Sequence, residues 1–586
     1  MFRAFRTPSG YRQTHSTRTL LVAGALAFGC VLGAGSTVRG DSSYDTLERL
    51  LPAQTVGVLS LPSVQRAQAI LDAWYAEFQG DAPSGERETP DVLHEIAQLL
   101  GMNAAHIDTK RPLAAALSLA MAGAPPMPSI LVPVRDEDAA LAALEGAGTS
   151  RFAASHASGR GYVIMTSALH YVADVGTFEL RAPRDPSDVR VALDLAKLYQ
   201  TYGPTLEFLL ASMMQQMQSD DADPSALEAT TRAAEWAREV LSNAERFELT
   251  LSAGTRPLRL SSTLRSRPGS PPVVPVRDPE RMLELTRVLD RDATLLAMVS
   301  ADLRALYDWS MTAQRNELDK QLHGTSPEQS DALLSLVEYS SDLQRLLAGP
   351  NAYSLDFDER GVRVVHLMQL EQSRTFVRTF RETMASLQVL EPLGLFVQER
   401  PAARLEGLDV HAWNLTFKPD FVSVRPQDEP SLVRDLSEMH QRLFGGDAGI
   451  VRLAIVDDVA VLVLHPDEFQ MRETLKRLKK KSGKAPKPIR ALAERHGDTP
   501  WLAVSADLRQ LVAGFVDAVI NPEAVSDARA YRALLDGAPV PVTLSSSQRA
   551  GVLHCELTAE VQALAAFFES FTRLLPERHA PPASGG

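Results

Sequence analysis

Short apolar runs, each followed by a helical pattern, recur along the chain. The segments 296–309 and 501–515 both contain Val-Ser-Ala-Asp-Leu-Arg, and looser copies lie at 189–199 and 56–71. In each copy a strand-like apolar run ends, and apolar residues then recur with the 3.6-residue period of a helix. A polar residue marks each junction, namely Asp302, Asp507, Asp194 and Ser63. These positions suit helix N-caps, and we interpret them as caps and not as catalytic carboxylates.

The order of elements after three of these copies is also similar. We expect two helices, a two-stranded hairpin and a further helix, as in 302–323, 327–347, the hairpin across Glu359–Arg360–Gly361, and 373–387. After the copy at 189–199, we expect helices at 195–217 and 225–246, strands at 247–253 and 257–265, and a helix at 278–288. After the copy at 501–515, we expect helices at 507–520 and 523–536, strands at 540–547 and 550–558, and a helix at 559–575. The pattern predicts an α+β fold of tandem β-α-α-β-β-α-like units, with small antiparallel or mixed sheets covered by helices.

Two further patterns support a modular chain. The stretches 131–145 and 273–286 share Val-Pro-Val-Arg-Asp followed by an amphipathic helix. The stretch 450–478 predicts a hairpin across Asp457–Asp458, followed by a helix that Pro466 introduces. The expected parts are 1–40 (signal peptide), 41–185 (N-terminal α+β module), 186–290 and 291–390 (repeat units), 391–490 (partial hairpin and helix module), 491–576 (C-terminal repeat unit) and 577–586 (disordered tail).

The first 40 residues have the features of an export signal. They contain five arginines and no acidic residue, and the apolar run Leu20–Gly35 follows the first four arginines. This arrangement predicts a secretory signal peptide cleaved after Ser36 or Gly40, and therefore a periplasmic or secreted protein. Two alternatives remain open, a lipid anchor on Cys30 and an uncleaved membrane anchor.

Composition narrows the classes of partner. The chain has 586 residues and a formal charge of −13, which argues against nucleic acid as a partner. Two cysteines exclude a disulfide-rich scaffold. Alternation places Cys555 on one strand face with Leu553 and Leu557, so we expect a buried, unreactive thiol.

Familiar catalytic and cofactor motifs are missing from the sequence. It contains no GxGxxG after a strand, no GxxxxGK[ST] and no GxSxG. His94–Glu95 begins like a zinc motif but lacks the second histidine, and Asp356 and Asp358 suit a hairpin turn better than a calcium loop. We expect no metal and no cofactor, and we assign no catalytic residue.

One basic cluster stands out in this acidic chain. The segment 476–487 contains six of the ten lysines, which are Lys476, Lys479, Lys480, Lys481, Lys484 and Lys487. The cluster could contact an anionic surface. It could instead be the C-terminus of a helix, where lysines interact favourably with the helix dipole.

The phrase 50–64 (LLPAQTVGVLSLPSV) and the Val-Ser-Ala-Asp-Leu-Arg repeats resemble a loosely defined group of exported bacterial proteins of unknown function. The resemblance implies a periplasmic or envelope setting in a Gram-negative bacterium and transfers no site residue. From the residues, we expect a non-enzymatic binding or scaffolding protein with an unknown protein or envelope partner. Two alternatives are a periplasmic hydrolase whose site is dispersed across modules, and a peripheral envelope adaptor that uses the basic cluster at 476–490.

Overall fold

The structure is a computed structural model that divides into two compact units. Unit 1 comprises Met1–Asp194 and Glu248–Leu260, and unit 2 comprises Leu195–Phe247 and Ser261–Gly586. The residues described are 46–69, 72, 91–119, 126–146, 155–166, 178, 188–217, 231, 234–235, 238–252, 257–302, 342–343, 345–393, 395–417, 436–446, 448–481, 483–496, 499–525 and 527–574. The expected signal peptide, Cys30 and the C-terminal tail lie outside them.

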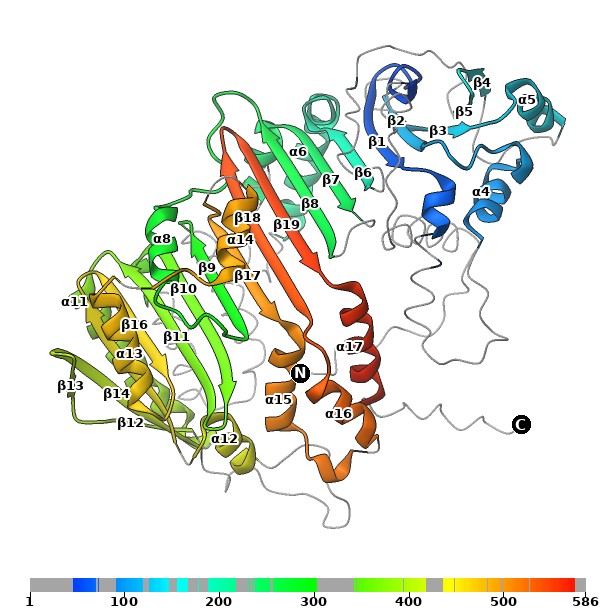
Figure 1. Ribbon diagram of the computed structural model, residues 1–586. Helices are drawn as coiled ribbons and strands as arrows, with labels where there is room; N and C mark the ends of the chain where they lie inside the picture. The colour runs from blue at the N-terminus through cyan, green and yellow to red at the C-terminus, as the bar shows by residue number, and fades with distance from the viewer. Residues whose placement is uncertain are drawn as a thin grey trace. The chain divides into compact units, whose positions relative to one another are not determined.

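Unit 1 contains an antiparallel sheet with the strand order β4-β5-β3-β2-β1-β6 (Figure 1). The strands are β1 (Thr55–Leu61), β2 (Leu113–Ser118), β3 (Met127–Pro133), β4 (Ser155–Gly159), β5 (Tyr162–Thr166) and β6 (Asp188–Asp194). Alternate side chains enter two separate cores. Val132 packs against helices α4 (Val92–Leu100) and α5 (Glu137–Gly146), whereas its neighbour Leu131 packs on the opposite face.

Unit 2 contains a longer antiparallel sheet with the order β19-β18-β17-β9-β10-β11-β16-β15-β14, and both β12 and β13 pair with β14. Its strands are β9 (Leu295–Ser300), β10 (Leu347–Asp358), β11 (Gly361–Leu370), β12 (Leu395–Glu399), β13 (Ala403–Leu405), β14 (Leu408–Phe417), β15 (Ala448–Val456), β16 (Val459–Leu464), β17 (Leu502–Asp507), β18 (Pro541–Arg549) and β19 (Val552–Ala559). The boundary between the units passes through β7 (Ala244–Ser252) and β8 (Leu258–Ser266).

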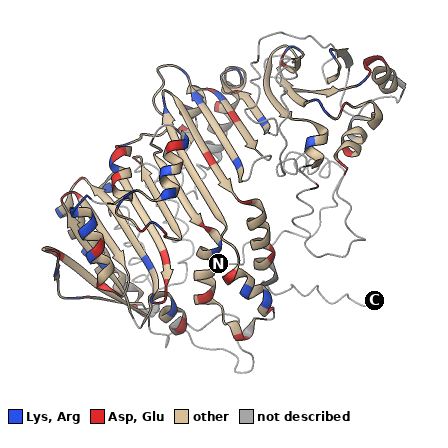
Figure 2. Cartoon of the chain, in the orientation of Figure 1, with Lys and Arg blue, Asp and Glu red and all other residues tan. Residues whose placement is uncertain are grey.

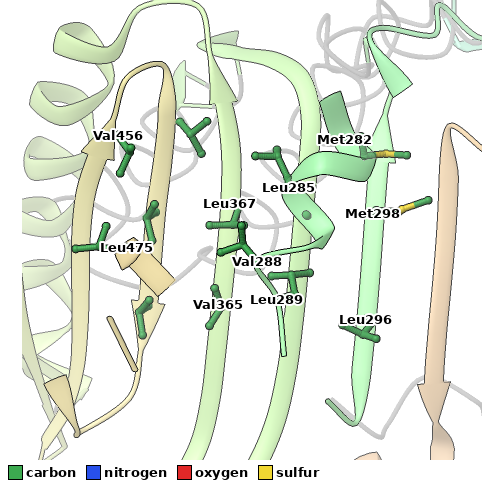
Figure 3. Close-up of a cluster of buried hydrophobic side chains, with 14 of the residues drawn as sticks. Met282, Leu285, Val288, Leu289, Leu296, Met298, Val365, Leu367, Val456 and Leu475 are labelled. Atoms are coloured by element: carbon green, nitrogen blue, oxygen red, sulfur yellow. The ribbon is translucent and has the colours of Figure 1, made fainter. Parts of the chain in front are cut away.

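Three helices pack on one face of the unit 2 sheet. They are α8 (Pro279–Thr286), α13 (Glu468–Lys479) and α14 (Lys487–His496). Figure 3 shows Leu285 of α8 and Val288, which lies two residues beyond the end of α8, in the same buried cluster as Leu367 of β11 and Leu475 of α13. Each helix has an apolar stripe, and burial of these stripes against the sheet fixes where the helix ends lie.

The opposite face of this sheet carries a second core. Met368 follows Leu367 on β11 and packs with Phe376 and Phe380 of α11 (Ser373–Ser386). A separate cluster joins Val512 of α15 (Leu508–Val519), Leu534 of α16 (Ala528–Asp536) and Phe567 of α17 (Val561–Leu574). Two further helices are α6 (Leu195–Met217) and α12 (Leu436–Phe444). No helix in the described part of the chain is both long and apolar enough to cross a membrane.

The α+β prediction is confirmed, and the sheet is larger than predicted. The first strands of two repeat copies, β9 and β17, pair along their edges, so strands expected in separate small sheets belong to one sheet. Met298 lies opposite Ala503, and each residue directly precedes Val-Ser-Ala-Asp in its own copy. The helices expected at 302–323 and 327–347 lie almost wholly outside the described residues, and β7 begins at Ala244 inside the helix expected at 225–246.

Both copies of Val-Pro-Val-Arg-Asp lead into the predicted helix, but only the first follows the expected strand, β3, and 273–276 form no strand in the second. Val134 and Val276 each form an isolated β-bridge. The carboxylate of Asp136 accepts a hydrogen bond from the backbone of Ala139, and that of Asp278 accepts one from Arg281. Each aspartate therefore caps the helix that follows it.

Candidate functional site

The basic cluster lies at the end of α13 and in the turn that leads to α14. Lys476 forms an ion pair with Glu473 at 3.0 Å, and Lys479 donates to the backbone carbonyl of Glu406. The remaining four side chains of the predicted set are exposed, which are Lys480, Lys481, Lys484 and Lys487. The dipole interpretation therefore suits Lys476 and Lys479, which lie in the last turn, and does not account for the other four lysines.

A tight turn brings this segment against the C-terminal end of α8. Lys481 has a left-handed φ of 47°, and Gly483 has a φ of 133°. A Cβ atom at Gly483 would lie 2.2 Å from the carbonyl oxygen of Arg287, so only glycine allows this approach. In addition, the Arg477 guanidinium donates to the carbonyl of Val288 at 3.4 Å. These contacts bring Arg287 into the basic segment, although it lies far away in the sequence.

A hollow of about 150 Å³ lies between α8, the end of α13 and the β15–β16 turn. Its apolar lining comes from five residues, which are Leu285, Val288, Val456, Val459 and Leu478. Its charged lining comes from Arg281, Glu284, Arg287, Asp457 and Lys481. The apolar members belong to the core on this face of the sheet or pack against it, so the hollow has a rigid floor.

The charges around the hollow are of two kinds. The Arg281 guanidinium is held by Glu284 at 3.0 Å, Asp458 at 3.2 Å and Gln369 at 3.1 Å. By contrast, the exposed side chains of Arg287, Lys481 and Asp457 have no hydrogen-bond or ion-pair partner among the described residues. Figure 2 shows Lys and Arg along α13, which borders the hollow.

This arrangement can bind a small charged group. The cations of Arg287 and Lys481 and the carboxylate of Asp457 surround an apolar floor, where the local dielectric is lower than in bulk water and charge interactions are stronger. Of the predicted lysines, only Lys481 lines the hollow. Arg287 and Asp457 are not predictable as site residues from the sequence, because nothing in the local pattern links α8 or the β15–β16 turn with the end of α13.

Two of the four polar junction residues of the repeats, Asp507 and Ser63, accept the hydrogen bonds expected of helix caps. Asp507 Oδ1 accepts hydrogen bonds from the backbone N–H groups of Arg509 at 3.1 Å, Gln510 at 3.2 Å and Val540 at 3.1 Å. Ser63 Oγ accepts one from Arg66 at 3.1 Å. These bonds confirm capping at both junctions. Asp302 forms an ion pair with Arg277 at 2.5 Å, and Asp194 directly precedes α6.

A buried histidine gives the nearest likeness to a dispersed catalytic pair. His465 Nε2 lies 3.3 Å from Asp358 Oδ2, and its Nδ1 accepts a hydrogen bond from the backbone of Asp467. The Arg452 guanidinium donates to the carbonyls of His465 and Pro466. The contacts of Arg452 and of His465 Nδ1 lie at the junction between β16 and α13, whereas Asp358 belongs to the end of β10.

The remaining candidate residues are placed as follows. Asp356 of β10 pairs with Arg363, directly opposite on β11, at 2.5 Å and accepts a hydrogen bond from Thr294 at 2.7 Å. No group of three metal-binding side chains lies within the described residues. The prediction for Cys555 is wrong in part. Cys555 is only half-buried, with its thiol 3.1 Å from Ser546 Oγ, and Leu557 on the same face is 39% exposed.

Comparison with known proteins gives no further assignment. No family model, curated protein or solved structure matches this chain.

Proposed function

We propose that the protein is an exported, non-enzymatic binding and scaffolding protein of the cell envelope that contacts an anionic surface through its basic segment. The exposed side chains of Lys480, Lys484 and Lys487 carry this proposal. They lie at the end of α13, in the turn that follows it and at the start of α14, and we propose that one surface contacts all three. Their positive charge is a local exception in a chain with a formal charge of −13.

The energy available to such a contact is sufficient for reversible binding. Each lysine or arginine near an anionic membrane surface contributes about 1 kcal/mol, so three lysines contribute about 3 kcal/mol. That corresponds to about a 100-fold change in affinity. Because the rest of the chain is acidic, we expect the contact to have one preferred orientation and to weaken at high salt.

The pairing of strands from different copies of the sequence motif supports the scaffolding part of the proposal. Equivalent residues of two copies, Met298 and Ala503, face each other across β9 and β17, which is the relationship that a local two-fold axis produces. In unit 1, β1 and β6 pair in the same antiparallel sense, and both strands carry the looser copies of the motif. Repeat copies that pair through their first strands can form an extended surface, and such a surface can bind partners without a catalytic centre.

Sedimentation with lipid vesicles tests the proposal. The full chain is compared with the variant K480A/K484A/K487A on vesicles containing phosphatidylglycerol and on neutral phosphatidylcholine vesicles. A control variant, R378A/R529A/R532A, removes three exposed arginines and the same charge. We expect the lysine variant to lose about 100-fold in affinity for the anionic vesicles and the control to lose little. Equal losses in both variants, or no loss in the lysine variant, would refute the proposed surface.

A further inference from the structure

We propose that the hollow beside α8 binds a zwitterionic phosphoethanolamine head group. The phosphate lies between Arg287 and Lys481, and the ammonium group lies against Asp457. This inference rests on the proposed function, because it names the lipid head group that the basic segment recognises. The two claims nevertheless depend on different residues and can fail separately.

The charges of the hollow favour a zwitterion over a simple anion. Arg281 is already engaged by Glu284 and Asp458, whereas the side chains of Arg287, Lys481 and Asp457 have no ion-pair or hydrogen-bond partner in the described part of the chain. A simple phosphate would gain from the two cations and would be repelled by the carboxylate of Asp457. An ammonium group two carbon atoms from the phosphate converts that repulsion into attraction, so a phosphoethanolamine uses all three charges.

The size and lining of the hollow fit this ligand. A cavity of about 150 Å³ accommodates a benzene-sized molecule. A phosphoethanolamine group is of comparable size, and its two methylene groups can contact the apolar floor. Val288 and Val459 are buried and belong to the core, so the floor is formed before the ligand arrives. A preformed floor lowers the ordering cost of binding.

The position of the hollow also suits a lipid head group. Lys481 lines the hollow, and the exposed Lys480 directly precedes it in the chain. A membrane that contacts Lys480, Lys484 and Lys487 therefore lies close to the opening. The basic segment then supplies long-range attraction, and the hollow supplies selectivity for one head group.

Calorimetric titration of the full chain tests the inference with soluble probes. The probes are glycerophosphoethanolamine, which carries the lipid phosphodiester, together with O-phosphoethanolamine, inorganic phosphate and ethanolamine. We expect R287A and K481A each to weaken binding of glycerophosphoethanolamine at least tenfold. We expect D457N to weaken it similarly, and to leave the weaker binding of inorganic phosphate unchanged or improved.

Other outcomes separate the alternatives. No detectable binding of either phosphoethanolamine probe would overturn the inference, as would equal loss of phosphate and glycerophosphoethanolamine binding in D457N. Binding of O-phosphoethanolamine alone would overturn the lipid assignment, because the ligand would then be a free phosphomonoester. The variant K480A/K484A/K487A leaves the hollow intact and should bind the soluble probes normally. If it does so while vesicle binding is unaffected, the proposed surface fails and the hollow stands.

Discussion

Met298 of β9 and Ala503 of β17 lie directly opposite each other, although they belong to different copies of the same sequence motif. Both side chains are buried, and both belong to the core that α8, α13 and α14 cover. The contact between the copies is therefore part of the main core of unit 2.

Shortening the Met298 side chain should destabilise the folded protein. We expect Met298→Ala to lower the free energy of unfolding by about 2–5 kcal/mol, because it leaves a cavity where two strands and a helix meet. Urea denaturation measures the change. Phe208, which is 71% exposed on α6, provides the comparison, and Phe208→Ala should change stability by about 0.5 kcal/mol or less. Similar small values for both variants would show that the strand pair contributes little.

The cap at Asp507 should contribute more to the free energy of unfolding than an ordinary helix cap does. Asp507 Oδ1 accepts hydrogen bonds from three backbone N–H groups, and one of these belongs to Val540 at the start of the next hairpin. Asp527 Oδ1 accepts one, from Ala530. We expect Asp507→Ala to cost about 2 kcal/mol, at the upper end for caps, and Asp527→Ala about 1 kcal/mol. Chemical denaturation of the two variants checks this order, and a larger loss for Asp527→Ala would contradict it.

Arg509 illustrates a buried charge with a structural role. Its guanidinium donates to the carbonyl of Ala533 and lies 5.7 Å from the Phe567 ring centroid, and burial lowers its pKa. Arg509→Met keeps much of the volume but leaves that carbonyl without its donor, which should cost about 1–3 kcal/mol. The matched variant is Arg529→Met, at an exposed position on α16, and it should be neutral. Equal thermal stability of the two variants would show that the Arg509 contacts with Ala533 and Phe567 do not stabilise the fold.

His366 should make stability depend on pH. Its ring lies against Tyr353 of β10, with 5.9 Å between ring centroids, and burial lowers its pKa from 6.5 to about 4. Between these values the unfolded chain binds a proton that the folded chain does not, so stability should fall as the pH decreases from 6.5 to 4. Below pH 4 this contribution should decrease no further.

Urea unfolding at several pH values measures this effect. We expect His366→Gln to reduce the slope of stability against pH between 4 and 6.5. The exposed His94 is the control residue, and His94→Gln should leave the slope unchanged. An unchanged slope in His366→Gln would show that the histidine is not kept neutral by the fold.

Local patterns predicted many elements closely. The helix expected at 195–217 is α6 (Leu195–Met217), and the hairpins across Arg360 and Asp457 form as expected. These features depend on residues near each other in the chain. The pairing of β9 with β17 and the hollow depend on residues far apart, and hydrophobic periodicity contains no information about which strand edges meet.

The candidate site, too, could be predicted from the sequence only where its residues lie close together in the chain. The lysines at 476–487 are visible as a composition bias, so the basic surface could be predicted. Arg287 and Asp457 look like ordinary surface residues in the sequence, and only the packing of α8 against the end of α13 places them beside Lys481. The face that contains Cys555 was expected to be buried, because alternation identifies a face without showing what covers it.

Binding of the full chain to vesicles with an increasing fraction of phosphatidylglycerol tests the central claim most directly. The account predicts that bound protein rises steeply with the anionic fraction, falls as salt increases from about 0.1 M to about 1 M, and depends on Lys480, Lys484 and Lys487. Binding that is equal on neutral and anionic vesicles, or that is absent at every composition, would contradict it.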